Sequence, residues 1–246
     1  MFPHSASFGA RPAKAVPEGS RVYAVGDIHG RRDLLDELLD AVAADAAGSR
    51  ATRRVVVFLG DYVDRGPDAR AVVERLAAGP PPGFEWIALR GNHEEFMLSF
   101  LVDRSLGPAW MRNGGRETVS SYLGPRADLD DPAALQRALL AALPEHHRAF
   151  MNALPLTHEE GDYLFVHAGI RPGVGLHHQA AEDLLWIRSD FLASRANHGK
   201  VVVHGHSVEL APVVRANRIG IDTGAYATGH LTALVLEGRD RRFLRT

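Results

Sequence analysis

The sequence predicts a mixed α/β fold in which strands and helices alternate along much of the chain. Short apolar runs rich in β-branched residues alternate with longer stretches whose apolar residues recur with a helical period. Five of the apolar runs end directly in carboxylate, imidazole or amide side chains, with a glycine close by. With 246 residues, 46% of them hydrophobic, the chain is long enough to bury the core of one large domain.

The first hundred residues are expected to hold three strands, each followed by a helix. The strands are predicted at residues 21–25, 54–59 and 84–89, and the helices at about 34–42, 68–78 and 96–100. Leucine and valine recur on one face of the first helix, and Gly79 with the three prolines after it ends the second. This order of elements favours parallel strands joined by helical crossovers.

The second half of the chain has a different pattern. Residues 105–158 are rich in alanine and leucine, and we expect them to form a helical insertion over one end of the sheet. Strands resume after it, at residues 163–166, 201–203, 218–222 and 231–237, and turn glycines between the last two suggest hairpins or a second sheet. Residues 1–20 are expected to be a loosely ordered tail, and residues 21–246 the main domain.

Composition excludes several classes of function. The net charge of −2 provides no global field that would gather nucleic acid or an anionic membrane. No apolar run approaches the roughly 18 residues of a membrane-spanning helix. The absence of cysteine excludes disulfides, thiolate ligands and a cysteine nucleophile. We therefore expect a cytoplasmic protein without nucleic-acid or membrane partners, in which Asp, Asn, Glu and His hold any metal.

Ionisable and amide side chains follow five predicted strands, where α/β sheets place their ligand sites. The sets are Asp27 with His29, Asp61 with Asp64 and Arg65, Asn92 with His93 and Glu94, His167, and His204 with His206. So many such groups at one sheet edge would repel or stay unpaired without a cation. Mixed oxygen and nitrogen ligands suit Mn, Fe or Zn. Their number favours two ions sharing a carboxylate, about 3.5–4 Å apart, which suits displacement at phosphorus.

The strand ends carry motifs that occur in a fixed order. They are Gly26-Asp27-Ile28-His29-Gly30, Gly60-Asp61-Tyr62-Val63-Asp64-Arg65-Gly66, Gly91-Asn92-His93-Glu94, His167-Ala168-Gly169 and Gly205-His206. In this order and spacing, from about residue 21 to 236, the chain resembles the phosphoprotein phosphatase family of metallophosphoesterases, and within it the compact bacterial serine/threonine phosphatases. Leu185-Trp186-Ile187-Arg188 resembles a further stretch of that bacterial branch. The resemblance implies a calcineurin-like β-sandwich of two mixed sheets flanked by helices.

The resemblance also implies a role for each matching residue. Six residues would hold two divalent ions, Mn²⁺ or alternatively Fe or Zn, with Asp61 as the bridge: Asp27, His29, Asp61, Asn92, His167 and His206. A hydroxide between the ions would attack phosphorus in line. His93 would protonate the leaving alkoxide and Asp64 would orient His93. Arg65 and Arg188, together with Asn92, would bind the phosphoryl oxygens.

Other polar residues are assigned smaller roles or none. Tyr226 is expected either to touch substrate at the mouth of the site or to pack in a turn. His204 either orients a ligand or simply ends a strand, and Asp222 is expected to be structural. His146 and His147 are neighbours on a predicted helix, so we expect them to face different directions and form no site.

The leading functional prediction is metal-dependent hydrolysis of phosphomonoesters, phosphoserine and phosphothreonine in proteins above all, with a small phosphoester as the other substrate class. The intact Asp64-Arg65 pair and Glu94 favour monoesters. The main alternative is hydrolysis of dinucleoside polyphosphates, since related hydrolases share the metal core. A nuclease is disfavoured because the near-neutral chain is only 7% aromatic. An inactive phosphate-binding scaffold is disfavoured because no residue of the pattern is missing. The oligomeric state is left open.

Overall fold

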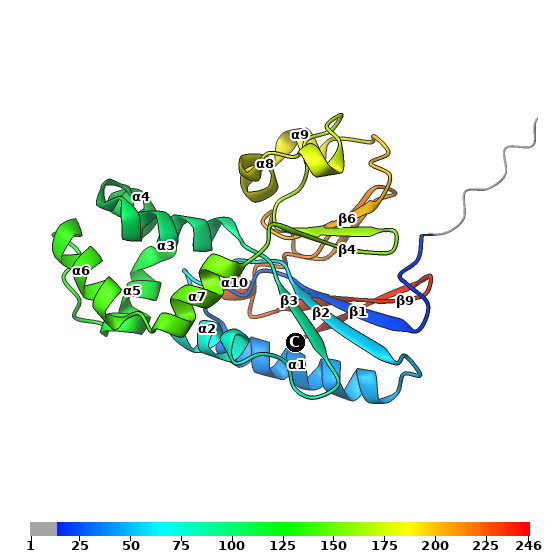
Figure 1. The fold of residues 1–246 in the computed structure, drawn as a ribbon, viewed down its shortest axis with the longest axis horizontal. Helices are drawn as coiled ribbons and strands as arrows, with labels where there is room; N and C mark the ends of the chain where they lie inside the picture. Colours follow the sequence, from blue (N-terminus) through cyan, green and yellow to red (C-terminus); the bar gives the residue numbers. More distant parts are fainter. Residues whose placement is uncertain (1–13) are drawn as a thin grey trace, which may run out of the picture.

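Two five-stranded sheets form the centre of the computed structural model, which describes residues 14–246 (Figure 1). The first sheet has the order β10-β9-β1-β2-β3. Its strands are β1 (Ser20–Val25), β2 (Arg53–Phe58), β3 (Glu85–Ala88), β9 (Thr232–Glu237) and β10 (Asp240–Arg245). β1, β2 and β3 run parallel, whereas β9 pairs antiparallel with both β1 and β10. The first sheet is therefore mixed.

The second sheet is also mixed and has the order β4-β5-β6-β8-β7. Its strands are β4 (Thr157–Glu160), β5 (Tyr163–Val166), β6 (Val201–His204), β7 (Val213–Val214) and β8 (Arg218–Gly220). β5, β6 and β8 are parallel, and the edge strands β4 and β7 are antiparallel to their neighbours.

The helices lie outside the two sheets. They are α1 (Arg32–Ala47), α2 (Ala69–Ala77), α3 (Asn92–Val102), α4 (Gly107–Trp110), α5 (Arg116–Leu123), α6 (Pro132–Ala142), α7 (Glu145–Ala153), α8 (Ala181–Trp186), α9 (Ser189–Leu192) and α10 (Ala225–Thr228). Figure 1 shows α1 and α2 below the first sheet, α8 and α9 above the second, and α3 to α7 gathered at one end. The molecule is thus layered helix, sheet, sheet, helix.

Alternation along the strands explains why the layers stack in this way. In β2, Val56 and Phe58 pack with leucines and valines of α1 and α2. Their neighbours Val55 and Val57 point to the opposite face and pack against β5, β6 and β8 of the second sheet. A strand that is apolar on both faces is buried on both sides, which is why the run from 55 to 59 lacks a polar residue.

The structure confirms the predicted class and corrects some of the elements. The two mixed sheets flanked by helices are present. No strand range was predicted for β4 or β10, because their sequences, Thr-His-Glu-Glu and Asp-Arg-Arg-Phe-Leu-Arg, are strongly polar. Both are edge strands, where one side of the ladder is open and charged side chains reach water. Pairing with an apolar neighbour, not intrinsic preference, makes them strands.

The predicted boundaries fall partly outside what the structure describes. The expected tail at residues 1–20 lies mainly in the undescribed part, but Val16 is buried and Ser20 begins β1. Helices occupy much of 105–158, and treating this stretch as an insertion in one domain stays a prediction. Within residues 14–246, no helix has the length and apolar character needed to cross a membrane.

Candidate active site

The predicted site residues converge where the parallel strands of both sheets end. Asp27 and His29 follow β1, Asp61 follows β2, and His167 follows β5. The remaining residues also follow parallel strands. Asp64 and Arg65 come after β2, Asn92 and His93 begin α3 after β3, and His206 comes after β6. Because the two sheets stack face to face, their carboxyl ends meet at one edge, and the structure brings these groups together there.

Backbone strain marks the same place. Five non-glycine residues of the described chain have positive φ: His29 at 46°, Asp61 at 54°, Asp64 at 70°, Arg65 at 67° and His206 at 60°. Each belongs to the predicted site. Side chains rarely adopt this conformation because the Cβ atom crowds the backbone, and such residues cluster at functional sites. The strain is an independent indication that this edge of the sheets is functional.

Asp61 lies at the centre of the cluster. Its Oδ2 is 3.5 Å from Nε2 of His29, and its Oδ1 is 3.4 Å from Nε2 of His167. The side chains therefore form two groups that share Asp61, one with His29 and His93, the other with His167 and His206. Asn92 joins the second group, because its Oδ1 is 2.7 Å from Nε2 of His167. This is the arrangement that a bridging carboxylate requires.

Hydrogen bonds to backbone carbonyls aim the histidine rings. Nδ1 of His29 donates to the carbonyl of Val63, and Nδ1 of His167 donates to that of Leu59, both at 2.9 Å. A carbonyl can only accept, so each Nδ1 carries the proton and each Nε2 lone pair faces the cluster. His206 Nε2 is buried and has no hydrogen-bond partner in the described chain. This orientation of imidazoles by an outer hydrogen bond is typical of metal ligands.

The charges of the cluster also fit cations. Asp27, Asp61 and Asp222 are all buried, and burial with the charges of Asp222 and Asp61 raises the pKa of Asp27. The guanidinium of Arg65 donates to Nε2 of both His29 and His93, each at 3.0 Å. A cation thus already faces the lone pair of His29 that a metal would use. An unpartnered imidazole nitrogen and crowded carboxylates are what divalent ions would relieve.

Two glycines let these groups approach so closely. A Cβ atom on Gly91 would lie 2.2 Å from Oδ1 of Asp61, and one on Gly205 would lie 2.0 Å from Oδ1 of Asp27. Neither carboxylate could keep its place against a larger residue. The glycines of the two motifs are therefore needed for space rather than for a left-handed backbone.

His93 and Asp64 form a buried pair beside the ligands. Nδ1 of His93 lies 2.7 Å from Oδ2 of Asp64. Asp64 also accepts hydrogen bonds from the indole of Trp110 at 2.9 Å and from the hydroxyl of Thr118 at 2.7 Å. Burial lowers the pKa of His93, but the charges of Asp61 and Asp64 outweigh it and raise the pKa overall. The pair can hold a proton near neutral pH.

The other predicted substrate residues lie at the surface of the cluster. Arg188 is exposed, and its charge helps to lower the pKa of His206, after the larger effects of burial and His167. Tyr226 is 39% exposed; its ring lies 5.4 Å from that of His29, and the Arg65 guanidinium stands 4.9 Å over it. Of the two readings of Tyr226, this position favours the mouth of the site over a packed turn.

Three contributions were missed from the sequence. Glu94 was grouped with the strand-end residues, but its supporting part was missed: its carboxylate accepts hydrogen bonds from the backbone of Gly91, Asp61, Tyr62 and Val63 at 2.7–3.2 Å. Its position directly after His93 was the available signal. Trp110 and Thr118, the donors to Asp64, come from distant segments with no motif of their own.

Asp222 and His204 differ in their relation to the cluster. Asp222 was expected to be structural; it is buried against Asp27, and burial raises its pKa to about 6. His204 bonds instead to the carbonyl of Gly205 and to Arg218, away from the ligands. Of its two readings, the simple strand end fits this position.

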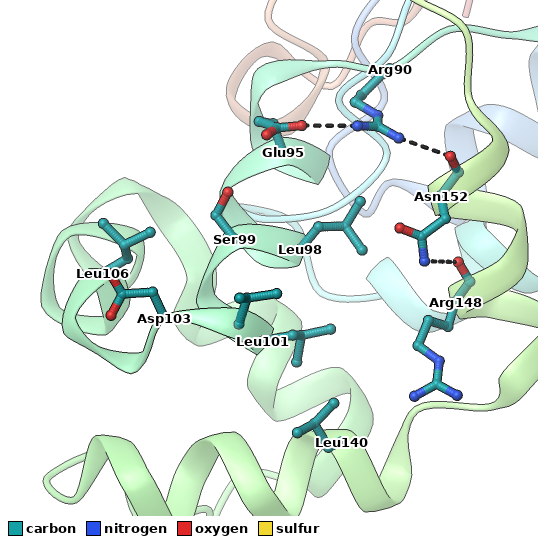
Figure 2. Close-up of a pocket in the computed structure, with 11 residues that line it drawn as sticks. Arg90, Glu95, Leu98, Ser99, Leu101, Asp103, Leu106, Leu140, Arg148 and Asn152 are labelled. Carbon is teal, nitrogen blue, oxygen red and sulfur yellow. Dashed lines mark hydrogen bonds and ion pairs between the residues drawn. The ribbon is translucent and has the colours of Figure 1, made fainter.

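A hollow of about 620 Å³ lies on another face, along α3 (Figure 2). Apolar side chains such as Leu98 and Leu101 line it. Figure 2 shows Arg90 at its upper edge, bonded to Glu95 and to the carbonyl of Asn152, both at 3.0 Å. None of the predicted ligands lines this hollow, so it is separate from the active-site cluster.

Comparison with known proteins identifies the family. Residues 20–231 match the sequence model of the calcineurin-like phosphoesterases. A bis(5'-nucleosyl)-tetraphosphatase, symmetrical, from Aromatoleum aromaticum is 32% identical over 152 residues; the match covers 62% of this chain but only 45% of that relative. The bis(5'-nucleosyl)-tetraphosphatase PrpE [asymmetrical] of Halalkalibacterium halodurans is 25% identical, with 85% of this chain and 87% of that protein covered.

Solved structures agree with the fold. A structure provisionally named a diadenosine tetraphosphatase superposes with a TM-score of 0.65 at 22% identity, over 95% of this chain and 98% of the other. At this identity the likeness shows the fold alone.

The relatives also correct the leading functional prediction. They are named as dinucleoside tetraphosphatases, so the prediction of a serine/threonine protein phosphatase is wrong, and the alternative weighed beside it is the better supported. The motifs misled because they consist mainly of candidate metal ligands, and enzymes that act on different substrates can share the same kind of metal site. The match over residues 20–231 shows that the chain belongs to the calcineurin-like phosphoesterase family.

Proposed function

We propose that this protein hydrolyses dinucleoside polyphosphates at a dinuclear metal centre. The observation that carries the proposal is a pair of exposed aromatic rings at the two ends of the ligand cluster, in a chain whose relatives are named for this substrate class. The ring centroid of Tyr226 lies 5.4 Å from that of His29. The ring centroid of Trp186, which is 40% exposed, lies 6.3 Å from that of His206. His29 and His206 belong to the two different groups that share Asp61.

Two aromatic rings suit a substrate that has a nucleobase at each end. Nucleobases stack on exposed aromatic side chains whatever their sequence, with about 1–3 kcal/mol per base. The polyphosphate between the bases would then cross the ligand cluster, where Arg188 and Arg65 supply positive charge. A phosphoserine or phosphothreonine residue carries no nucleobase that could stack on these rings.

Six residues are proposed to hold the two ions: Asp27, His29, Asp61, Asn92, His167 and His206. When bound, divalent ions such as Mn²⁺ would activate water and neutralise charge on the phosphoryl oxygens. The mixed carboxylate, amide and imidazole donors suit Mn, Fe or Zn. The chain's own part is to bring these donors together on strained turns and to fix the ring tautomers.

His93 is proposed as the proton donor to the leaving oxygen. Asp64 holds the ring through Nδ1, which leaves Nε2 facing the cluster, 3.9 Å from Oδ2 of Asp61. Water adds to one phosphorus, the P–O bond to the next phosphate breaks, and the leaving phosphate takes the proton. A phosphate leaves far more easily than an alkoxide, so proton donation matters less for this substrate than for an alkyl monoester.

The test compares substrates on metal-stripped protein resupplied with Mn²⁺. We expect hydrolysis of diadenosine tetraphosphate with little action on phosphoserine or phosphothreonine peptides, and product analysis would distinguish two ADP from ATP plus AMP. Trp186→Ala and Tyr226→Ala should each raise KM for the dinucleotide about 5- to 150-fold, from the loss of one stacked base. Neither variant should change KM for an alkyl phosphate such as glycerol phosphate, which has no aromatic group to stack.

Phe243→Ala is the matched control. Phe243 is an aromatic residue of similar exposure, 38%, on the edge strand β10. It should leave KM for the dinucleotide unchanged. Preference for the phosphopeptides, or equal KM values in all three variants, would refute the proposed substrate.

A further inference from the structure

Three metal-ligating side chains meet at a second place, between α2 and α7. Nε2 of His147 lies 2.9 Å from Oε2 of Glu74, and Nε2 of His146 lies 3.2 Å from the same oxygen. The ligand atoms of all three lie within 4.8 Å of one another. The expectation that the two histidines face different directions was wrong, since their rings meet edge to face at 4.5 Å.

The two histidines reach Glu74 in different ways. His147 is fully buried, whereas His146 and Glu74 are more than half exposed. Adjacent residues on a helix diverge by about 100°. Both rings nevertheless reach the same carboxylate. His147 is buried in the interface with α2, and the exposed side chain of His146 lies against Glu74 from outside.

Tyr122 of α5 fixes the buried ring from the other side. Its hydroxyl lies 2.8 Å from Nδ1 of His147, and Tyr122 is itself buried. If Nδ1 donates to this hydroxyl, the lone pair on Nε2 is free and points at Glu74. An imidazole oriented by an outer partner is the usual form of a metal ligand.

The spacing fits a small tetrahedral ion. Ligand atoms about 2.1 Å from Zn²⁺ in a tetrahedral site lie about 3.4 Å from one another. The two measured separations, 2.9 and 3.2 Å, need only small adjustments to reach this value. Two histidines and one carboxylate with a fourth position open to water form a known zinc donor set. The charge of Arg70, which lies close enough to lower the pKa of His147, opposes the ion, while Glu74 favours it.

We propose that Glu74, His146 and His147 bind one divalent transition-metal ion, with Zn²⁺ the best fit, at a site distinct from the active-site cluster. The ion would fasten α2 to α7, two helices that come from sequence-distant parts of the chain. α2 begins shortly after the strained turn that carries Asp64 and Arg65, so the site would hold the helix that follows this turn. The role is structural, and the catalytic metals are not involved.

The experiment counts bound zinc on the full chain. Wild type and variants are supplied with Mn²⁺, dialysed against the same low concentration of Zn²⁺, and analysed by atomic emission. Any replacement of Mn²⁺ by Zn²⁺ at the active-site cluster occurs equally in wild type and in the variants. We expect Glu74→Gln and His146→Ala to bind one Zn²⁺ fewer per chain than wild type. Both residues are exposed, so both variants should fold, and circular dichroism checks this.

A second readout separates a metal site from a simple hydrogen-bonded tie. Added Zn²⁺ should raise the unfolding temperature of wild type more than that of either variant, because a ligand that binds only the folded chain stabilises it. Tyr122→Phe should keep the zinc but weaken its affinity by about tenfold, the low end of the effect expected from losing an outer partner.

His158→Ala is the control. His158 lies 3.0 Å from Oε1 of Glu160, so it offers the same kinds of group, but only two of them. This variant should bind as much zinc as wild type. Equal zinc content in wild type, Glu74→Gln and His146→Ala would overturn the proposal and leave a hydrogen-bonded tie between two helices.

Discussion

Replacing Glu94 by glutamine should destabilise the protein, although the change is nearly isosteric. The Glu94 carboxylate accepts four backbone N–H bonds, three from the loop that follows β2 and one from Gly91, the residue before α3. Oε2 accepts from Asp61 at 2.8 Å and Gly91 at 2.9 Å, and Oε1 accepts from Tyr62 at 2.7 Å and Val63 at 3.2 Å. Glutamine keeps one acceptor oxygen, so its amide nitrogen must face two of these donors.

The magnitude follows from those two donors. A buried donor left without a partner costs about 1–3 kcal/mol, so two cost about 2–6 kcal/mol. This is a large part of the roughly 5–15 kcal/mol by which a domain is usually stable. The two donors are either Gly91 with Asp61 or Tyr62 with Val63, depending on the orientation of the amide, so in both cases the damage falls on the segment that contains or directly follows the proposed bridging ligand.

Denaturant unfolding with excess chelator measures this cost without a contribution from metal binding. Burial and the charge of Asp61 raise the pKa of Glu94 to about 7, so the ionised carboxylate is itself unfavourable in the folded chain, and its replacement by a neutral amide offsets part of the cost of the two unpaired donors. The measurement belongs at about pH 8.5, where the carboxylate is ionised and all four hydrogen bonds are formed. Glu95→Gln is the matched control. Glu95 is the next residue, is 39% exposed and pairs with Arg90 at 3.0 Å, so its loss should cost less than about 1 kcal/mol. A free energy of unfolding for Glu94→Gln within 0.5 kcal/mol of wild type would refute the reasoning.

Three further predictions concern the ligands, the proton donor and the contact between the sheets. Asp61→Asn should lower the content of both metals, measured by atomic emission, because both groups of ligands share this carboxylate; normal content would remove it as the bridge. His93→Ala should keep two metals and lower kcat by about 10²–10⁴ for an alkyl phosphate, and by less for a dinucleotide, whose leaving group needs the proton less; metal loss would argue against a proton donor. Glu160→Gln should lower the free energy of unfolding by about 1 kcal/mol at neutral pH, because Glu160 on β4 bonds Arg53 on β2 at 2.8 Å and Arg53 is partly exposed. Although burial raises the pKa of Glu160, the hydrogen bonds from Arg53 and His158 lower it overall. The stabilisation that Glu160 provides is therefore present above its ordinary pKa of 4.5 and is lost as the pH falls below that value. A difference in unfolding free energy between variant and wild type that does not shrink in acid would contradict this account.

Much of the catalytic cluster could be predicted because its members follow strands. A strand that ends in Asp-x-His or Asn-His-Glu delivers its polar groups to the sheet edge, and parallel strands share that edge. Asp27, Asp61 and His167 could therefore be grouped before their distances were known. The substrate class could not be predicted in this way, because the proposed contacts are exposed side chains such as Trp186, whose position depends on how separate loops pack.

The supports of the cluster lay beyond sequence reasoning for the same reason. Trp110 and Thr118 hold Asp64 across long stretches of chain, and nothing in their own neighbourhoods indicates this role. The convergence of His146 and His147 on Glu74 also depends on the docking of α7 against α2. The helix period alone predicted divergence, and the packed interface decided otherwise.

By itself, the sequence determined the alternation of strands and helices and the set of groups placed at the strand ends. Both depend on local order, namely the period of the apolar residues and the residue types that follow them. Only the tertiary structure decided which faces the strands bury, that polar edge segments become β4 and β10, and which distant side chains orient Asp64 and His147. Those outcomes depend on contacts between residues far apart in the chain, which a local pattern does not encode.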